Sequence, residues 1–182
     1  VTFIGTDADD RFIVNTDDAS VTTHSWMYDN DQTVTIDGGD GNNYYEVDTY
    51  TATISNLDGN NNYEIDATKV DIDAGNGNNH FEGEVVNFTA NVGDGDNRFD
   101  IRAFDSGETT VWDFEDDFET SVTINAGEGS NLINLFVDED EIESGFGGHF
   151  LHPATINITA GDGGNVINLP ALQRGDDSFE NG

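Results

Sequence analysis

The 182-residue chain contains no cysteine, only five lysine and arginine residues, two prolines and no apolar run of 18 residues. The missing cysteine excludes a disulfide framework, a thiol nucleophile and a zinc–thiolate site. Without a long apolar run, the sequence predicts no membrane insertion. The 38 aspartate and glutamate residues give a formal net charge of −33, an excess that repels nucleic acid. We therefore expect cations as partners.

The missing cysteines and the missing leader segment also bear on the location of the protein. The sequence starts at Val1 without a charged and apolar leader, so we expect either a mature product or an excised segment. A protein that folds without disulfides fits export, and calcium outside cells would neutralise its acidic side chains. We expect an extracellular, secreted or cell-surface location.

Glycine is plentiful, and it recurs at fixed spacing. When the repeats are aligned on the second glycine of a G-x-G turn, they read "GDGNNYYEV", "LDGNNNYEI", "GNGNNHFEG", "GDGDNRFDI", "GEGSNLINL" and "GDGGNVINL", with that glycine at Gly41, Gly59, Gly77, Gly95, Gly129 and Gly163. The spacings are 18, 18, 18, 34 and 34 residues. We expect each longer spacing to contain one degenerate unit, "WDFEDDFE" (112–119) and "SGFGGHFL" (144–151).

Apolar residues recur in register on both sides of each turn. After the turn stand Tyr45, Tyr63, Phe81, Phe99, Ile133 and Ile167, and the segment before it carries Ile36, Ile54, Ile72, Ala90, Ile124 and Ile158. Period-two alternation around a glycine turn predicts two short strands in each unit. Because an 18-residue unit cannot bury its apolar side chains alone, the units must stack.

The sequence therefore predicts an all-β protein, a parallel β-solenoid of about ten rungs of 17–18 residues. We expect one domain over residues 1–182. It would contain regular repeats at 33–101, a degenerate rung at 102–120, further repeats at 121–169 and an irregular end at 170–182.

The segment 38–46, "GGDGNNYYE", resembles the RTX (repeats-in-toxin) nonapeptide G-G-x-G-x-D-x-U-x, except that Asn43 replaces the aspartate. The segments "GTDADDRFI" (5–13) and "GDDSFENG" (175–182) place Asp10 and Asp177 at that position. The resemblance implies a calcium-loaded β-roll. Here only one half of each unit carries the glycine motif, so any row of calcium ions should lie on one side.

Two interpretations of the turns remain open. Stacked asparagines can bond to one another and to the turn backbone without any ion. Alternatively, the carboxylates stacked at the middle of G-x-G repel one another, and calcium, which takes oxygen ligands, would relieve that repulsion. The candidate metal ligands are Asp7, Asp10, Asp40, Asn43, Asp58, Asn61, Asn76, Asn79, Asp94, Asn97, Glu128, Asn131, Asp162, Asn165 and Asp177.

Three further outward-facing groups of residues are expected. Glu46, Glu64, Glu82 and Asp100 form an acidic one, which either binds cations or simply solubilises the surface. Threonines at Thr33, Thr51, Thr35 and Thr53 resemble the arrays of some ice-binding proteins, although threonine is also a common exposed strand residue. Leu132 and Val166 point outward and could form an apolar contact patch.

The sequence does not predict an enzyme, because its histidines lack H-E-x-x-H spacing and no G-x-S-x-G or Walker motif is present. We expect an extracellular calcium-binding structural protein that assembles with copies of itself into a filament, sheath or surface layer. One alternative is a repeat module of a larger secreted hydrolase or adhesin. The other is an ice- or surface-binding solenoid that uses its threonine columns.

Overall fold

The computed structural model describes residues 1–15, 33–104, 120–138, 142–143, 149–150 and 154–169, and all its regular elements are strands. The strands are β1 (Thr2–Ile4), β2 (Arg11–Asn15), β3 (Thr33–Asp37), β4 (Tyr44–Ser55), β5 (Asn62–Ala74), β6 (His80–Val92), β7 (Arg98–Phe104), β8 (Ser121–Ala126), β9 (Leu132–Asp138), β10 (Ile142–Glu143), β11 (His149–Phe150), β12 (Thr155–Ala160) and β13 (Val166–Asn168). These ranges contain no helix, so nothing in them has the form of a membrane-crossing helix.

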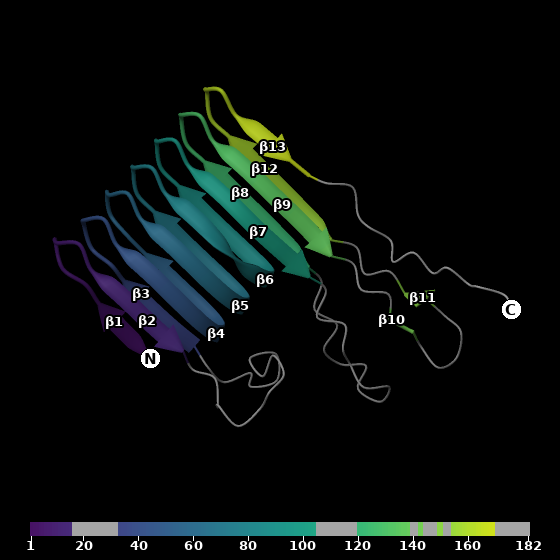
Figure 1. The fold of residues 1–182 in the computed structure, drawn as a ribbon, viewed down its shortest axis with the longest axis horizontal. Coiled ribbons are helices and arrows are strands. Elements are labelled where there is room, and N and C mark those ends of the chain that lie inside the picture. The colour runs from purple at the N-terminus through teal and green to yellow at the C-terminus, as the bar shows by residue number, and fades with distance from the viewer. Residues whose placement is uncertain (16–32, 105–119, 139–141, 144–148, 151–153, 170–182) are drawn as a thin grey trace, which may run out of the picture.

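Eleven of the strands form one parallel sheet, while β10 and β11 form a separate antiparallel pair. Figure 1 shows the strands as a stack in which the chain turns back at one end of every unit. The register follows the 18-residue repeat, because Tyr44 pairs with Asn62 and Asn62 with His80. The prediction of an all-β fold with parallel strands is confirmed.

The side of each unit opposite the glycine turn differs from the prediction of two short strands. β4, β5 and β6 run through this bend as continuous strands of 12 or 13 residues. Between β5 and β6 the pairing skips one position, Thr68, and resumes in the same register at Lys69. The bend therefore interrupts the strand pairing at one position only, and the sheet continues through it.

The two 34-residue spacings do not add a rung to the sheet. Across the first, β7 pairs directly with β9, so that Arg98 lies opposite Leu132, and β6 pairs directly with β8. Across the second, β9 pairs directly with β13 and β8 with β12. The degenerate rung expected at 102–120 is therefore not stacked between these units, and the count of about ten rungs is not confirmed. Residues 105–119, and the predicted irregular end at 170–182, lie outside the described residues.

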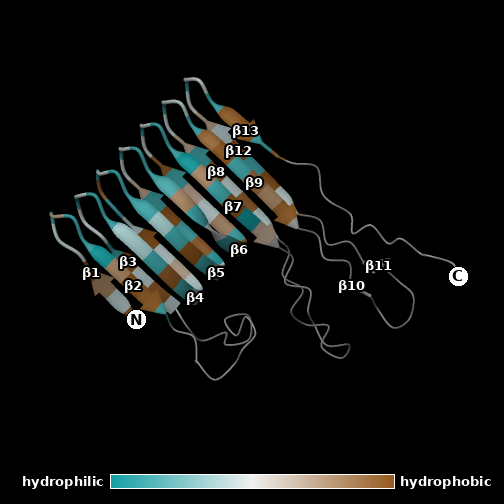
Figure 2. Cartoon of the chain, in the orientation of Figure 1, coloured by the Kyte–Doolittle hydropathy of each residue, from teal (hydrophilic) through white to brown (hydrophobic). Residues whose placement is uncertain are grey.

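The core lies between the two halves of each unit, and buried and exposed residues alternate along strands such as β4 and β5. Figure 2 shows hydrophobic and hydrophilic residues interspersed along the strands. Its centre is a stack of aromatic rings from Phe12 through Tyr45, Tyr63 and Phe81 to Phe99. Neighbouring ring centroids are 4.5–5.2 Å apart and the planes differ by 8° or less. The distance between equivalent rings in successive units thus matches the distance between neighbouring strands of a sheet.

The second glycine of each G-x-G turn is required by the stacking. Gly77 has a φ of 134°, a region that L side chains rarely adopt. A Cβ added there would lie 2.1 Å from the carbonyl oxygen of Gly59 in the preceding unit. Backbone therefore packs directly on backbone at this turn.

We expect Gly77→Ala to lower the free energy of unfolding by more than about 2 kcal/mol, because it adds a backbone clash to a strained φ. Urea unfolding followed by circular dichroism measures the change. Gly164→Ala is the control, since the nearest atom to a Cβ there is the Ser130 Oγ at 3.5 Å. Equal stability of Gly77→Ala and the parent protein would contradict this account of the turn.

Candidate functional site

The glycine-turn end of the stack holds most of the candidate ligands, and hydrogen bonds between adjacent units connect them. The predicted asparagine column forms what we call the buried ladder: Asp10, Asn43, Asn61, Asn79, Asn97, Asn131 and Asn165. In it, the side-chain oxygen of each asparagine accepts the backbone N–H of the equivalent residue in the preceding unit, at 2.8–3.1 Å. The asparagines from Asn43 to Asn131 are 1–2% exposed.

The side-chain amide groups of the same asparagines are also engaged. Asn79 Nδ2 donates to the Gly77 carbonyl oxygen at 3.1 Å and to Asn97 Oδ1 at 3.2 Å. Asn79 Oδ1 accepts from both N and Nδ2 of Asn61. Each such asparagine thus closes its own turn and joins it to both neighbours, which is the arrangement expected of an ion-free ladder.

Two more ladders run along the exposed side of the turns. The middle ladder contains the middle residues of G-x-G, where Asp58 Oδ1 accepts the Asn76 N–H at 2.8 Å and Asn76 Oδ1 accepts the Asp94 N–H at 2.9 Å. The outer ladder contains the residue before each buried asparagine: Asp9, Asn42, Asn60, Asn78, Asp96 and Ser130. Its links are 2.7–2.8 Å long.

The three ladders do not point the same way. In the middle and outer ladders, the oxygen of one unit accepts an N–H from the following unit, as from Asp40 Oδ1 to the Asp58 N–H. In the buried ladder the acceptor belongs to the following unit and the donor to the preceding one. Every inner turn is therefore bonded by side chains to both of its neighbours.

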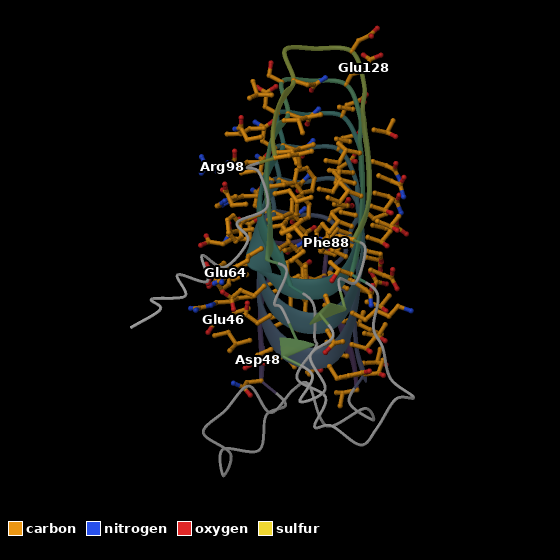
Figure 3. All side chains as sticks on the ribbon, turned by 90° about the vertical axis from the view of Figure 1, so that its right-hand side faces the viewer. Glu46, Asp48, Glu64, Phe88, Arg98 and Glu128 are labelled. Atoms are coloured by element: carbon orange, nitrogen blue, oxygen red, sulfur yellow. The ribbon has the colours of Figure 1, made fainter. Side chains whose placement is uncertain are left out.

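The buried ladder does not fit a calcium ion in this conformation. Both lone pairs of Asn79 Oδ1 already accept hydrogen bonds, and the residue is 1% exposed. The middle ladder fits better, because Asp58, Asp94 and Glu128 are exposed and each aspartate uses only Oδ1 in the ladder. Figure 3 shows Glu128 at the turn end of the stack.

The remaining candidate ligands lie at the ends of these columns. Asp7 and Asp162 are exposed. Asp10 continues the buried ladder, and its Oδ2 accepts the N–H and hydroxyl of Thr6 at 2.6 and 3.0 Å. Asp177 lies outside the described residues. Within the described ranges, no three histidine, aspartate or glutamate side chains gather closely enough to form a metal-binding group.

The acidic column predicted on the strands lies on an outward surface that we call the acidic face, the outer side of residues 44–48, 62–66, 80–84 and 98–102. Glu46 pairs with Glu64, Glu64 with Glu82 and Glu82 with Asp100. An open groove of about 710 Å³ follows these side chains. Figure 3 shows Glu46, Glu64 and Arg98 projecting from one side of the stack.

Some carboxylates of the acidic face have local partners. Asp100 receives hydrogen bonds from Arg98, from His80 at 3.2 Å and from Asn134 at 2.6 Å. Burial opposes its ionisation, but these bonds outweigh that effect and hold the pKa of Asp100 below its usual value. A hydrogen bond to Glu64 raises the pKa of Tyr44 to about 12. These contacts hold the surface side chains in place and do not form an acid–base pair.

The other predicted surfaces are present only in part. Thr33 pairs with Thr51 and Thr35 with Thr53, but the next partners in these columns are Lys69 and Asp71. The first column is therefore interrupted after two units. The second begins at Thr2, which pairs with Thr35, so it spans three units before Asp71 and resumes at Thr89 and Thr123. Leu132 pairs with Val166, which is 50% exposed, so these two side chains do lie together near one end of the stack.

Sequence reasoning missed the outer ladder. A signal was present, because asparagine, aspartate or serine precedes the buried asparagine in "NN", "DN" and "SN". The side chains at this position all carry an oxygen that can accept a backbone N–H. The variation in residue type made the column resemble ordinary turn sequence.

We expect Asn79→Asp to lower the free energy of unfolding by about 2–4 kcal/mol at pH 7, because it buries a carboxylate beside two acceptor oxygens. Burial would raise the pKa of this aspartate in the folded state. Its destabilising effect should therefore be small below pH 4 and grow as the pH rises. Urea unfolding at several pH values measures this.

Asn78→Asp is the matched control, since Asp96 and Asp9 already serve at that position of the outer ladder. It should change the free energy of unfolding by less than about 0.5 kcal/mol. If both variants were equally stable at neutral pH, the buried ladder would not have the role assigned to it.

The chain matches no protein-family model, no curated protein and no solved structure. Its resemblance to the RTX repeat therefore rests on its own residues.

Proposed function

We propose that this chain is an extracellular structural protein, a parallel β-solenoid of the RTX β-roll type. It binds calcium and assembles with copies of itself into a filament, sheath or surface layer. The observation that carries this proposal is the set of three hydrogen-bonded ladders, which link successive turns along the stack. Such a stack resists bending and separation because each unit is bonded to its neighbours at the turns and in the sheet.

A structural role is also supported by how the polar side chains are used. His80 lies between Asn62 Oδ1 at 3.1 Å and Asp100 Oδ2 at 3.2 Å, and the carboxylates around it take part in surface pairs. We propose no catalytic activity. The acidic surface fits an extracellular location, with no binding to nucleic acid and no insertion into membranes.

Calcium, in this proposal, reinforces a stack that already folds without it. Stacked carboxylates about 5 Å apart repel by about 1 kcal/mol per pair in water. In the middle ladder the adjacent carboxylates are Asp40 with Asp58 and Asp94 with Glu128. The oxygens that Asp58 and Asp94 do not use in the ladder are the expected calcium ligands, one in each of these pairs. A divalent cation held there would remove the repulsion and leave the backbone bonds to Oδ1 unchanged.

We expect the protein to remain folded in a chelator and its melting temperature to rise as calcium is added in the millimolar range. Asp58→Asn and Asp94→Asn keep the Oδ1 acceptor but remove the charge. The double variant should therefore be at least as stable without calcium and lose most of the calcium-induced rise. Thermal unfolding followed by circular dichroism measures both effects.

Sodium chloride at matched ionic strength separates binding from screening. A saturable rise with calcium that sodium does not reproduce supports the proposal. The same rise with sodium, or with the double variant, would show that calcium acts only by screening.

A further inference from the structure

The charge of the stack is concentrated in its middle. The acidic face carries Glu46, Asp48, Glu64, Asp66, Glu82, Glu84 and Asp100 on β4 to β7. At one end of this surface β2 presents Arg11, Ile13 and Asn15. At the other end β9 and β13 present Leu132, Asn134, Phe136, Val166 and Asn168. Both described ends of a strongly acidic surface are thus free of carboxylates, and depletion of charge is typical of the centre of a protein interface.

Exposed apolar side chains gather at the same two ends. Ile4 and Ile13 are 77% and 58% exposed in the first described unit. At their positions, the inner units carry polar residues such as Asp37 and Glu46. At the opposite end, Ile167 and Leu169 are about half exposed and line an open groove of about 690 Å³.

The hydrogen-bonding groups of the two ends are complementary. Within the stack, the N–H of each buried-ladder residue is accepted by the following unit, but the N–H of Asn165 has no acceptor among the described residues. At the other end, Asp10 uses Oδ2 for Thr6, and its Oδ1 has no hydrogen bond to a described residue. The last described unit therefore offers the Asn165 N–H as a donor, and the first offers Asp10 Oδ1 as an acceptor. This is the same direction as every link of the buried ladder.

We propose that the face formed by β12 and β13 binds the face formed by β1 and β2 of a second copy, which continues the 18-residue register from one molecule into the next. This inference rests on the proposed function and specifies the surfaces through which the copies would assemble. Phe3 of the second copy would cover Ile158, and Phe12 would cover Ile167. Because the two faces differ, the contact is heterologous and extends into a filament without closing as a dimer.

The contact is small, so association should be weak and depend on concentration. The end strands β1, β2, β12 and β13 have three to six residues and are therefore about 10–20 Å long. Two such strands set about 10 Å apart with their side chains give an end face of at most about 400 Å² per copy. This is about half of what a standard interface buries. Salt should strengthen the contact, because it screens the repulsion between the acidic middles and between the turn carboxylates Asp7 and Asp162 of the two end units.

Sedimentation velocity of the full chain over a range of concentrations tests this inference. The mean mass should rise above 19.7 kDa with concentration and further with sodium chloride, through dimers to longer species. Ile13→Glu, which adds a charge at an exposed position of the first unit, should weaken association at least tenfold. Leu57→Glu is the matched control, since Leu57 is 60% exposed in the middle of the stack, and it should associate like the parent.

Asn168 is the residue that would precede Ile13 in its column across the contact. The pair Ile13→Glu with Asn168→Lys should therefore recover most of the association at low salt. A monomer at every concentration, or a closed dimer, would overturn the inference. If the parent assembles and Ile13→Glu assembles equally, end-to-end contact is wrong while assembly by another surface, and thus the proposed function, stands.

Discussion

The stack depends on a single recurring interaction, in which a side-chain oxygen of one unit accepts a turn N–H of an adjacent unit. A chain reversal packed against another reversal leaves backbone N–H groups that no strand ladder pairs, and those of the buried asparagines are also shielded from water. Asparagine, aspartate and serine at three neighbouring positions provide the acceptors. The buried asparagines in addition donate to turn carbonyls, so donors and acceptors are both paired. The close approach that these bonds require is also why the turn must contain glycine.

The aromatic core and the ladders impose the same geometry. Ring stacking from Phe12 to Phe99 sets a separation of 4.5–5.2 Å between units, and the strand pairing sets a similar one. Tyr45 fits into this column because position 38 is glycine, where a Cβ would lie 1.8 Å from the tyrosine hydroxyl. Burial raises the pKa of Tyr45 to about 12. Tyr63 of the following unit is also fully buried, and burial raises the pKa of its hydroxyl as well.

Most of the fold could be predicted from the sequence, since the period of 18 residues, the alternation and the apolar columns all point to parallel stacking. The pairing across the 34-residue spacings could not, because aromatic residues within 105–119 resemble a core column. Only the direct contact of β7 with β9 excludes a rung between them. Of the site, the two predicted columns lie where the repeat places them. The middle aspartates bond to backbone N–H groups, which charge patterning does not reveal.

The ladders also determine where the chain can change in length. Gain or loss of one whole unit preserves every donor–acceptor pair, whereas a shift of one residue at the turn breaks all three ladders at once. At the bend the described residues show one link of this kind, from the Glu84 N–H to Asp66 Oδ1. The strands β2, β7 and β9 end on this side of the stack, immediately before residues 16–32, 105–119 and 139–153. Added residues at the bend therefore leave the three turn ladders intact, whereas the turn side keeps them only if whole units are gained or lost.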